Sequence, residues 1–221
     1  KLNSMRKVNR TFYFSVEGQT EQQYIQWLQN AINNSPEASC HVKLSVKVEK
    51  DPLSYIKTFT TISKNEVMHL FDYESSDFEH RCQFIETLKK MKKASSSGKK
   101  VKYLLGYSNF TFELWMILHK EDCNSQLANR TQYLSRINRA FGTNFQSLPE
   151  YKRHDNFEKI LDSLTLDDVR NAIRRSENIM SENKTRGYTL QNQYGYKFYD
   201  QNPSLSINDC MKSVLLTCDL I

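Results

Sequence analysis

The chain has 221 residues, with 31 Lys or Arg against 25 Asp or Glu, so its formal charge is +6. This length suits one ordinary domain with an extension, and the basic balance favours a polyanionic partner without requiring one. Five cysteines without a C-x-x-C pair argue against a zinc knuckle or a disulfide framework, and no apolar run approaches a membrane span or a signal-peptide core. We therefore expect a cytoplasmic chain with reduced thiols and no membrane contact.

The first predicted strand covers residues 11–17, which are rich in β-formers and end at Glu17-Gly18. A glycine there lets the backbone turn sharply or approach a ligand closely. Apolar residues at helical spacing then predict a helix with Thr20 as its N-cap, ending at Asn33-Asn34-Ser35-Pro36. Glu17 thus lies at a strand-to-helix junction. Glu21 lies in the first helical turn, where we prefer a structural role in stabilising the helix end.

Residues 41–49 alternate apolar with polar side chains, which predicts a strand with one wet face near a sheet edge. After Asp51-Pro52, the stretch from Leu53 to Ile62 is interpreted as a helix.

The next predicted strand, Val67 to Glu74, is the stretch on which the functional interpretation of the sequence mainly depends. Its sequence V-M-H-L-F-D-Y-E is apolar without helical spacing, which predicts a strand buried on both faces. In an extended segment residues two apart point to the same side, so Asp72 and Glu74 are expected to project together from the carboxyl end. Parallel sheets bind ligands there, and paired carboxylates suit a hard divalent cation. The plain alternative is an acidic loop after a core strand.

A helix is predicted from Asp77 to Ala94, with one apolar face formed by Phe78, Cys82, Ile85, Leu88 and Met91. Val101 to Tyr107 is predicted as a fourth strand.

Residues 108–119 are interpreted as a buried helix with Ser108 or Asn109 as its cap. Glu113 interrupts its apolar surface, so its charge must be paired, neutralised or bound to something, with a structural salt bridge as the alternative to a functional role. His119 is expected to be a capping or core-edge histidine.

Four strands alternating with helices predict an α/β domain at residues 5–122, with a mostly parallel four-stranded sheet flanked by helices. Helical patterns at 125–141, 155–163 and 166–183 and a last helix from Ser206 to Leu216 predict a largely helical C-terminal region, 123–221, packed on it. Residues 184–201 show no clear period. Two basic clusters, around Lys152 and at Arg170, Arg174 and Arg175, either bind a polyanion or form solvated faces.

Several of these segments together resemble the RloB family, which is similar to Toprim-fold nucleases of bacterial defence against phage. The resemblance rests on Glu17-Gly18, Thr20-Glu21, Asp72-x-Glu74, the run S-N-x-x-F-E-L-W-x-x-L-H at 108–119, and N-P-S at 202–204. It spans roughly residues 12–215, and the 108–119 segment is its most specific part.

This resemblance implies a Toprim-like sheet, a divalent-metal site and a partner ATPase of the ABC or AAA type. The Toprim glutamate then falls on Glu17 and the acidic pair on Asp72 and Glu74. The second acidic position is usually Asp, so Glu74 shifts the metal geometry or weakens a second ion, and Asp77 is a possible substitute. Glu113 matches a glutamate of the family, without an assigned role.

The resemblance implies phosphodiester hydrolysis of DNA, tRNA or another RNA, and the residues fit this chemistry if Asp72 and Glu74 hold Mg²⁺ or Mn²⁺. Glu17 is expected to help hold the ion or to act as general base, and Lys152 or a nearby Arg to stabilise phosphate charge. The competing interpretation is a catalytically degenerate Toprim scaffold or sensor that binds the ATPase. A topoisomerase- or primase-like activity is disfavoured, because no strand-passage or zinc region accompanies the sheet.

Overall fold

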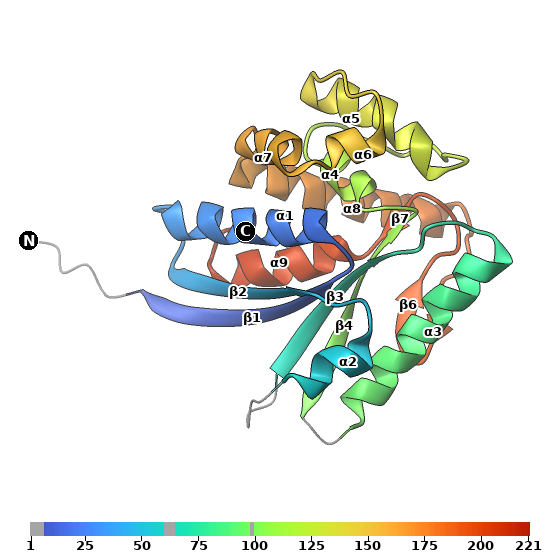
Figure 1. Cartoon of the computed structure of the whole chain (residues 1–221), viewed down its shortest axis with the longest axis horizontal. Coiled ribbons are helices and arrows are strands. Elements are labelled where there is room, and N and C mark those ends of the chain that lie inside the picture. Colours follow the sequence, from blue (N-terminus) through green and yellow to red (C-terminus); the bar gives the residue numbers. More distant parts are fainter. Residues whose placement is uncertain (1–6, 60–64, 98–99) are drawn as a thin grey trace, which may run out of the picture.

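The computed structural model describes residues 7–59, 65–97 and 100–221. Its main sheet has the strand order β2-β1-β3-β4-β7 (Figure 1). Four neighbouring strands are parallel: β1 (Val8–Val16), β2 (Cys40–Val48), β3 (Asn65–Asp72) and β4 (Val101–Asn109). The short β7 (Ser204–Leu205) pairs antiparallel with the end of β4. The predicted parallel α/β sheet of Toprim-like kind is confirmed, whereas β7 was not predicted.

Helices cover both faces of this sheet (Figure 1). One face carries α1 (Gln19–Asn34) and α9 (Ile207–Thr217), and the other carries α2 (Pro52–Lys57) and α3 (Phe78–Ser95). Strand β3 shows why both layers form. Its Met68 and Leu70 join the apolar cluster on the α1 side, while Val67 and Phe71 join the cluster on the α3 side. The prediction of a strand buried on both faces is therefore confirmed.

The predicted apolar face of α3 is partly wrong. Phe78 is 84% exposed and Cys82 is also exposed, whereas the buried residues of the helix are Phe84, Leu88, Met91 and Ala94. The buried face of the helix begins at Phe84, whose ring stacks on the ring of Phe71 in β3. Phe78 lies outside this stripe, directly after the N-cap residue Asp77. The helix predicted to reach Ile62 ends at Lys57, and residues 60–64 lie outside the described part of the chain.

The segment 108–119 is not one helix. Ser108 and Asn109 are the last residues of β4, and only α4 (Glu113–Leu118) is helical, with Phe112 at the N-cap position. The expected cap at Ser108 or Asn109 is therefore wrong. All six residues of α4 are buried, as the apolar pattern predicts.

The region after α4 is mostly helical, as predicted, but it is more divided. Besides α9, its helices are η1 (Arg130–Gln132), α5 (Tyr133–Phe141), α6 (Leu148–Tyr151), α7 (His154–Asp162) and α8 (Leu166–Thr185). The stretch without clear period contains a hairpin of β5 (Gln191–Gln193) and β6 (Tyr196–Phe198). One apolar cluster joins residues of the sheet, α4, α8 and α9, so both regions contribute to one core.

The predicted edge position of β2 is also confirmed, and α1 covers part of its outer edge. The Asn33 side chain donates to the Val42 carbonyl (2.9 Å) and accepts from the Val42 amide (2.8 Å). Gln29 Oε1 accepts from the Leu44 amide (2.8 Å). Side chains of one helix thus replace a neighbouring strand along this stretch. Among the helices of the described residues, none is long and apolar enough to cross a membrane.

Candidate functional site

The site lies where β1 and β3 end side by side. Glu17 follows the last residue of β1, and its Oε2 accepts a hydrogen bond from the backbone amide of Asp72 at the end of β3 (3.0 Å). Gly18, and not the expected Thr20, is the N-cap of α1, and no side chain caps that end. A Cβ on Gly18 would lie 3.1 Å from Glu21 Oε2, so the glycine leaves room for this carboxylate. The chain thus brings Glu17 and Asp72 together as the sequence predicts.

A cleft of about 310 Å³ opens at this point. Its charged lining combines four carboxylates with three cations: Glu17, Glu21, Asp72, Glu74, Lys50, Arg130 and Lys152. An adjoining hollow of about 290 Å³ shares Glu17, Lys50, Asp72 and Glu74 with it. Carboxylates flanked by cations suit a ligand that carries both a metal ion and a phosphate group.

Burial and mutual repulsion raise the pKa values of three cleft carboxylates, Glu17, Glu21 and Asp72. Burial raises the pKa of Asp72 well above its usual value, and the charges of Glu17, Glu21 and Glu113 raise it further. Burial also raises the pKa of Glu17, with a smaller contribution from Glu74. For Glu21, burial and the neighbouring Glu113 and Glu17 raise the pKa to about 7. A divalent cation would relieve this repulsion, so the donor set fits such an ion.

Glu113 is fully buried and paired beside the cleft. Lys152 Nζ lies 2.9 Å from Glu113 Oε1, and the Thr111 hydroxyl donates to Glu113 Oε2. The Lys152 side chain is 30% exposed and also lines the cleft. Burial alone would lower the pKa of Lys152, but the charge of Glu113 and its hydrogen bond outweigh burial and raise it. The salt bridge left open by the sequence is therefore present, and it connects Glu113 to the site.

Glu74 does not project beside Asp72 in the way the extended pattern predicts. Strand β3 ends at Asp72, and Glu74 has a φ of 62°, in the left-handed region that interrupts the alternation. Its side chain still lines the cleft, where it lies 3.2 Å from His80 Nε2 and 3.7 Å from Arg130 Nη1. Asp77, the possible substitute, is the N-cap of α3 and accepts from His80 Nδ1 (2.6 Å), outside the cleft lining.

Three residues of the site have no functional role in the sequence interpretation. Glu21 was assigned a helix-end role, yet it is only 6% exposed and lines the cleft. Its place in the first turn of α1, only four residues after Glu17, is the signal that could have identified it. Lys50 and Arg130 come from segments that carry no motif, so only the fold shows that they reach the cleft.

Other sequence candidates have structural roles. His119 is buried and contacts the Tyr24 hydroxyl and the Trp115 carbonyl, both at 3.0 Å, and burial lowers its pKa to about 4. The expectation of a core histidine is confirmed. On α8, Arg170 pairs with Glu37 (2.8 Å), and Arg175 donates to two carbonyls at the end of α4.

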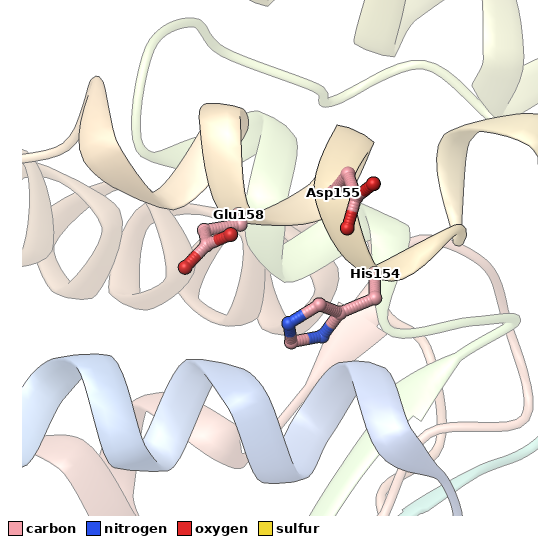
Figure 2. A group of neighbouring side chains, drawn as sticks. All are labelled: His154, Asp155 and Glu158. Atoms are coloured by element: carbon pink, nitrogen blue, oxygen red, sulfur yellow. The ribbon is translucent and has the colours of Figure 1, made fainter.

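A separate cluster lies on the first turns of α7, where His154, Asp155 and Glu158 have ligand atoms within 4.8 Å of one another (Figure 2). All three residues are exposed, and an acidic residue in a first turn already favours the helix dipole. We assign no site to this cluster. Among the described residues, no three cleft carboxylates have ligand atoms all within 4.8 Å of one another. Mg²⁺ usually keeps several water ligands, so it does not need three protein ligands that close together.

Comparison with known proteins adds one finding. The model of a family described as RloB-like protein matches residues 12–208. No curated protein and no solved structure gives a significant match.

Proposed function

The chain belongs to the RloB-like family, and from this premise we propose that it is a divalent-metal-dependent nuclease that hydrolyses phosphodiester bonds of DNA or RNA, including tRNA. One observation gives the strongest support to the proposal. Glu17, Glu21 and Asp72 meet at the carboxyl end of a parallel sheet with raised pKa values, next to three cations. Carboxylates gathered at such a cost in repulsion are typical of a site built for a metal ion.

In this proposal Glu17, Glu21, Asp72 and Glu74 hold Mg²⁺ or Mn²⁺. The bound ion would polarise a phosphoryl oxygen and lower the pKa of a water molecule. Lys50 and Arg130 bind the phosphate backbone at the cleft wall. Lys152 is fixed by Glu113 and presents its ammonium group to the same cleft, where it stabilises the charge that develops on phosphate. Glu17 serves as a metal ligand or as a general base.

The first test is cleavage of plasmid DNA and of total tRNA by the purified chain with Mg²⁺ or Mn²⁺. Asp72→Asn and Glu17→Gln change the charge with little change in shape, and we expect each to lower cleavage at least about 100-fold. Asp155→Asn, at the exposed α7 cluster, is the matched control and should leave the rate unchanged. Cleavage that survives both cleft substitutions would refute the assignment.

The second candidate function is a catalytically degenerate Toprim scaffold or sensor that binds a partner ATPase. It is favoured by Glu74, whose carboxylate lies against His80 and Arg130 and departs from the usual Asp. Calorimetric titration with Mn²⁺ separates the two functions. A nuclease should bind the ion and lose binding in Asp72→Asn, whereas a scaffold should show no binding that depends on Asp72.

A role as the effector of an anti-phage defence system, working with an ABC- or AAA-type ATPase, is part of the same proposal. It is supported by family membership. The test is phage plating on cells that carry the chain together with the ATPase encoded beside it. Protection should be lost with Asp72→Asn, and protection that persists in that variant would contradict an effector role for the cleft.

A further inference from the structure

Two cysteines that are distant in sequence meet at the edge of the sheet opposite the cleft. Cys40 is the first residue of β2, and Cys218 is the C-cap residue of α9. Both side chains are buried, and their Sγ atoms lie 3.0 Å apart. The nine residues of β2 separate Cys40 from the carboxyl edge of the sheet, where the cleft opens, by roughly 26 Å. Neither cysteine has a role in the proposed hydrolysis.

The backbone holds the two free thiols in a position from which a disulfide bond can form. The Ser39 amide donates to the Cys218 carbonyl (3.0 Å), so the two chain segments lie side by side. The Cys40 thiol also lies 3.5 Å from the Thr217 carbonyl. Because the two sulfurs of a disulfide are about 2.05 Å apart, these sulfurs need to approach by only about 1 Å. Rotation about the side-chain bonds can supply this movement without a change of fold.

Arg170 of α8 fixes both segments that carry the cysteines. Its Nε donates to the Leu220 carbonyl (2.7 Å), two residues after Cys218. Its Nη2 pairs with Glu37 (2.8 Å), three residues before Cys40. The thiols are buried in this arrangement, so a reagent in solution reaches them only when the two segments separate.

Burial also lowers the chemical reactivity of the pair. A cysteine reacts with a disulfide as its thiolate, and the protonated thiol is inert. Burial and the hydrogen bond to Cys40 raise the pKa of Cys218 to about 12. Oxidation is therefore expected to be slow in the closed chain and faster once the segments are released.

We propose that Cys40 and Cys218 form a reversible redox pair that is oxidised by a low-molecular-weight disulfide and protected by Arg170. First, one cysteine thiolate attacks a sulfur of the reagent, which gives a mixed disulfide and releases one reagent thiolate. The second cysteine thiolate then attacks the protein sulfur of the mixed disulfide and releases the other reagent thiolate. The protein loses two electrons and two protons, and the reagent takes up both and becomes two thiols.

The disulfide stabilises the fold by closing nearly the whole chain into one loop. The two cysteines are 178 residues apart in the sequence. A disulfide restricts the unfolded chain, and the restriction grows with the length of the closed loop. The oxidised chain should therefore unfold at a higher temperature than the reduced chain. This inference is independent of the proposed nuclease function.

The test is oxidation of the full chain carrying Cys82→Ser, because the exposed Cys82 would itself react with the reagent. Oxidised glutathione should remove two hydrogen atoms per chain by mass spectrometry, and peptide mapping should show Cys40 joined to Cys218. The midpoint of thermal unfolding should rise by at least about 4 °C, and dithiothreitol should reverse the rise. Cys40→Ser and Cys218→Ser should each abolish it. Cys123→Ser, at another buried cysteine, is the matched control and should keep it.

A second measurement tests the protection by Arg170. Arg170→Ala removes hydrogen bonds of a charged donor to both segments, so disulfide formation should become at least about tenfold faster. Arg174→Ala, at an exposed arginine of the same helix, should leave the rate unchanged. Free thiols that persist even in Arg170→Ala, a bond that joins another pair of cysteines, or equal rates with and without Arg170 would each overturn the inference.

Discussion

At the scale of single residues, Glu21 shows that the site lowers the stability of the fold. Its carboxylate is buried near Glu17 and Glu113, and its pKa is raised to about 7. The folded state therefore binds this proton more tightly than the unfolded state, whose pKa is near 4.5. The contribution of Glu21 to folding stability is therefore fully present below the unfolded pKa and is lost as pH rises through about 7.

This linkage predicts the effect of Glu21→Gln. In chelating buffer at about pH 8 the variant should be more stable by about 3 kcal/mol, because the pKa of Glu21 rises from 4.5 to about 7 and one pKa unit corresponds to about 1.4 kcal/mol. At about pH 4, where Glu21 is protonated in both states, the gain should disappear. Urea unfolding at the two pH values measures the difference. Glu158→Gln, at an exposed carboxylate, should show no such dependence on pH, and equal gains at both pH values would contradict the explanation.

The sequence identifies some residues of the site better than others. Glu17 and Asp72 are predictable because parallel strands place their carboxyl ends at one edge of the sheet. The direction of the Glu74 side chain is not predictable, because its left-handed backbone interrupts the two-residue alternation on which the prediction depends. Glu21 has an ordinary helix-end explanation in the sequence, and only its burial beside Glu17 distinguishes the two roles.

At the scale of elements, the C-terminal end of α4 is stabilised by an arginine that is distant in sequence. Arg175 of α8 donates to the carbonyls of Leu118 (2.8 Å) and His119 (3.1 Å), where the backbone of a helix end otherwise lacks donors. Hydrogen bonds from charged donors contribute about 1.5 to 3 kcal/mol. We expect Arg175→Ala to lower the free energy of unfolding by about 2 kcal/mol, as measured by urea denaturation.

Arg174→Ala is the control for this prediction, because Arg174 lies on the same helix, is exposed and donates to the side chain of Asn171 (3.3 Å). Its effect should be within about 0.5 kcal/mol of zero. Equal losses in the two variants would show that charge on α8, and not the bonds to α4, stabilises the chain.

Elements are predictable from the sequence where their period is long and consistent. Strand β3 and the two-layer packing around it follow from an uninterrupted apolar run. Residues 110–118 are mostly apolar, so their pattern has no clear period and cannot show that Ser108 and Asn109 continue a strand. Strand β7 has two residues and exists only through its pairing with β4, a long-range contact that local pattern does not contain.

At the scale of the whole molecule, the site needs both halves of the chain. Residues before 123 supply the carboxylates, whereas Arg130 and Lys152 come from the later region, which also contributes β7 and α9 to the sheet and core. The boundary between residues 5–122 and 123–221 stays a prediction. Because one apolar cluster contains residues of both regions, we expect that residues 5–122 do not fold independently.

We therefore expect a fragment of residues 5–122 to lack a cooperative thermal transition by circular dichroism, because α4 would expose its fully buried apolar residues. The full chain, measured alongside, should unfold cooperatively. Mixing the fragment with residues 123–221 should restore at least part of the transition. A sharp transition from the first fragment alone would show that it is an independent domain.

The hydrogen bonds between β2 and the side chains of Asn33 and Gln29 affect how this molecule can contact other chains. An extended segment that tried to lengthen the sheet beside Val42 and Leu44 would first have to displace both side chains. Strand addition is therefore disfavoured along this stretch of the β2 edge, which lowers the tendency of the chain to aggregate edge to edge there and favours recognition of a partner through other surfaces.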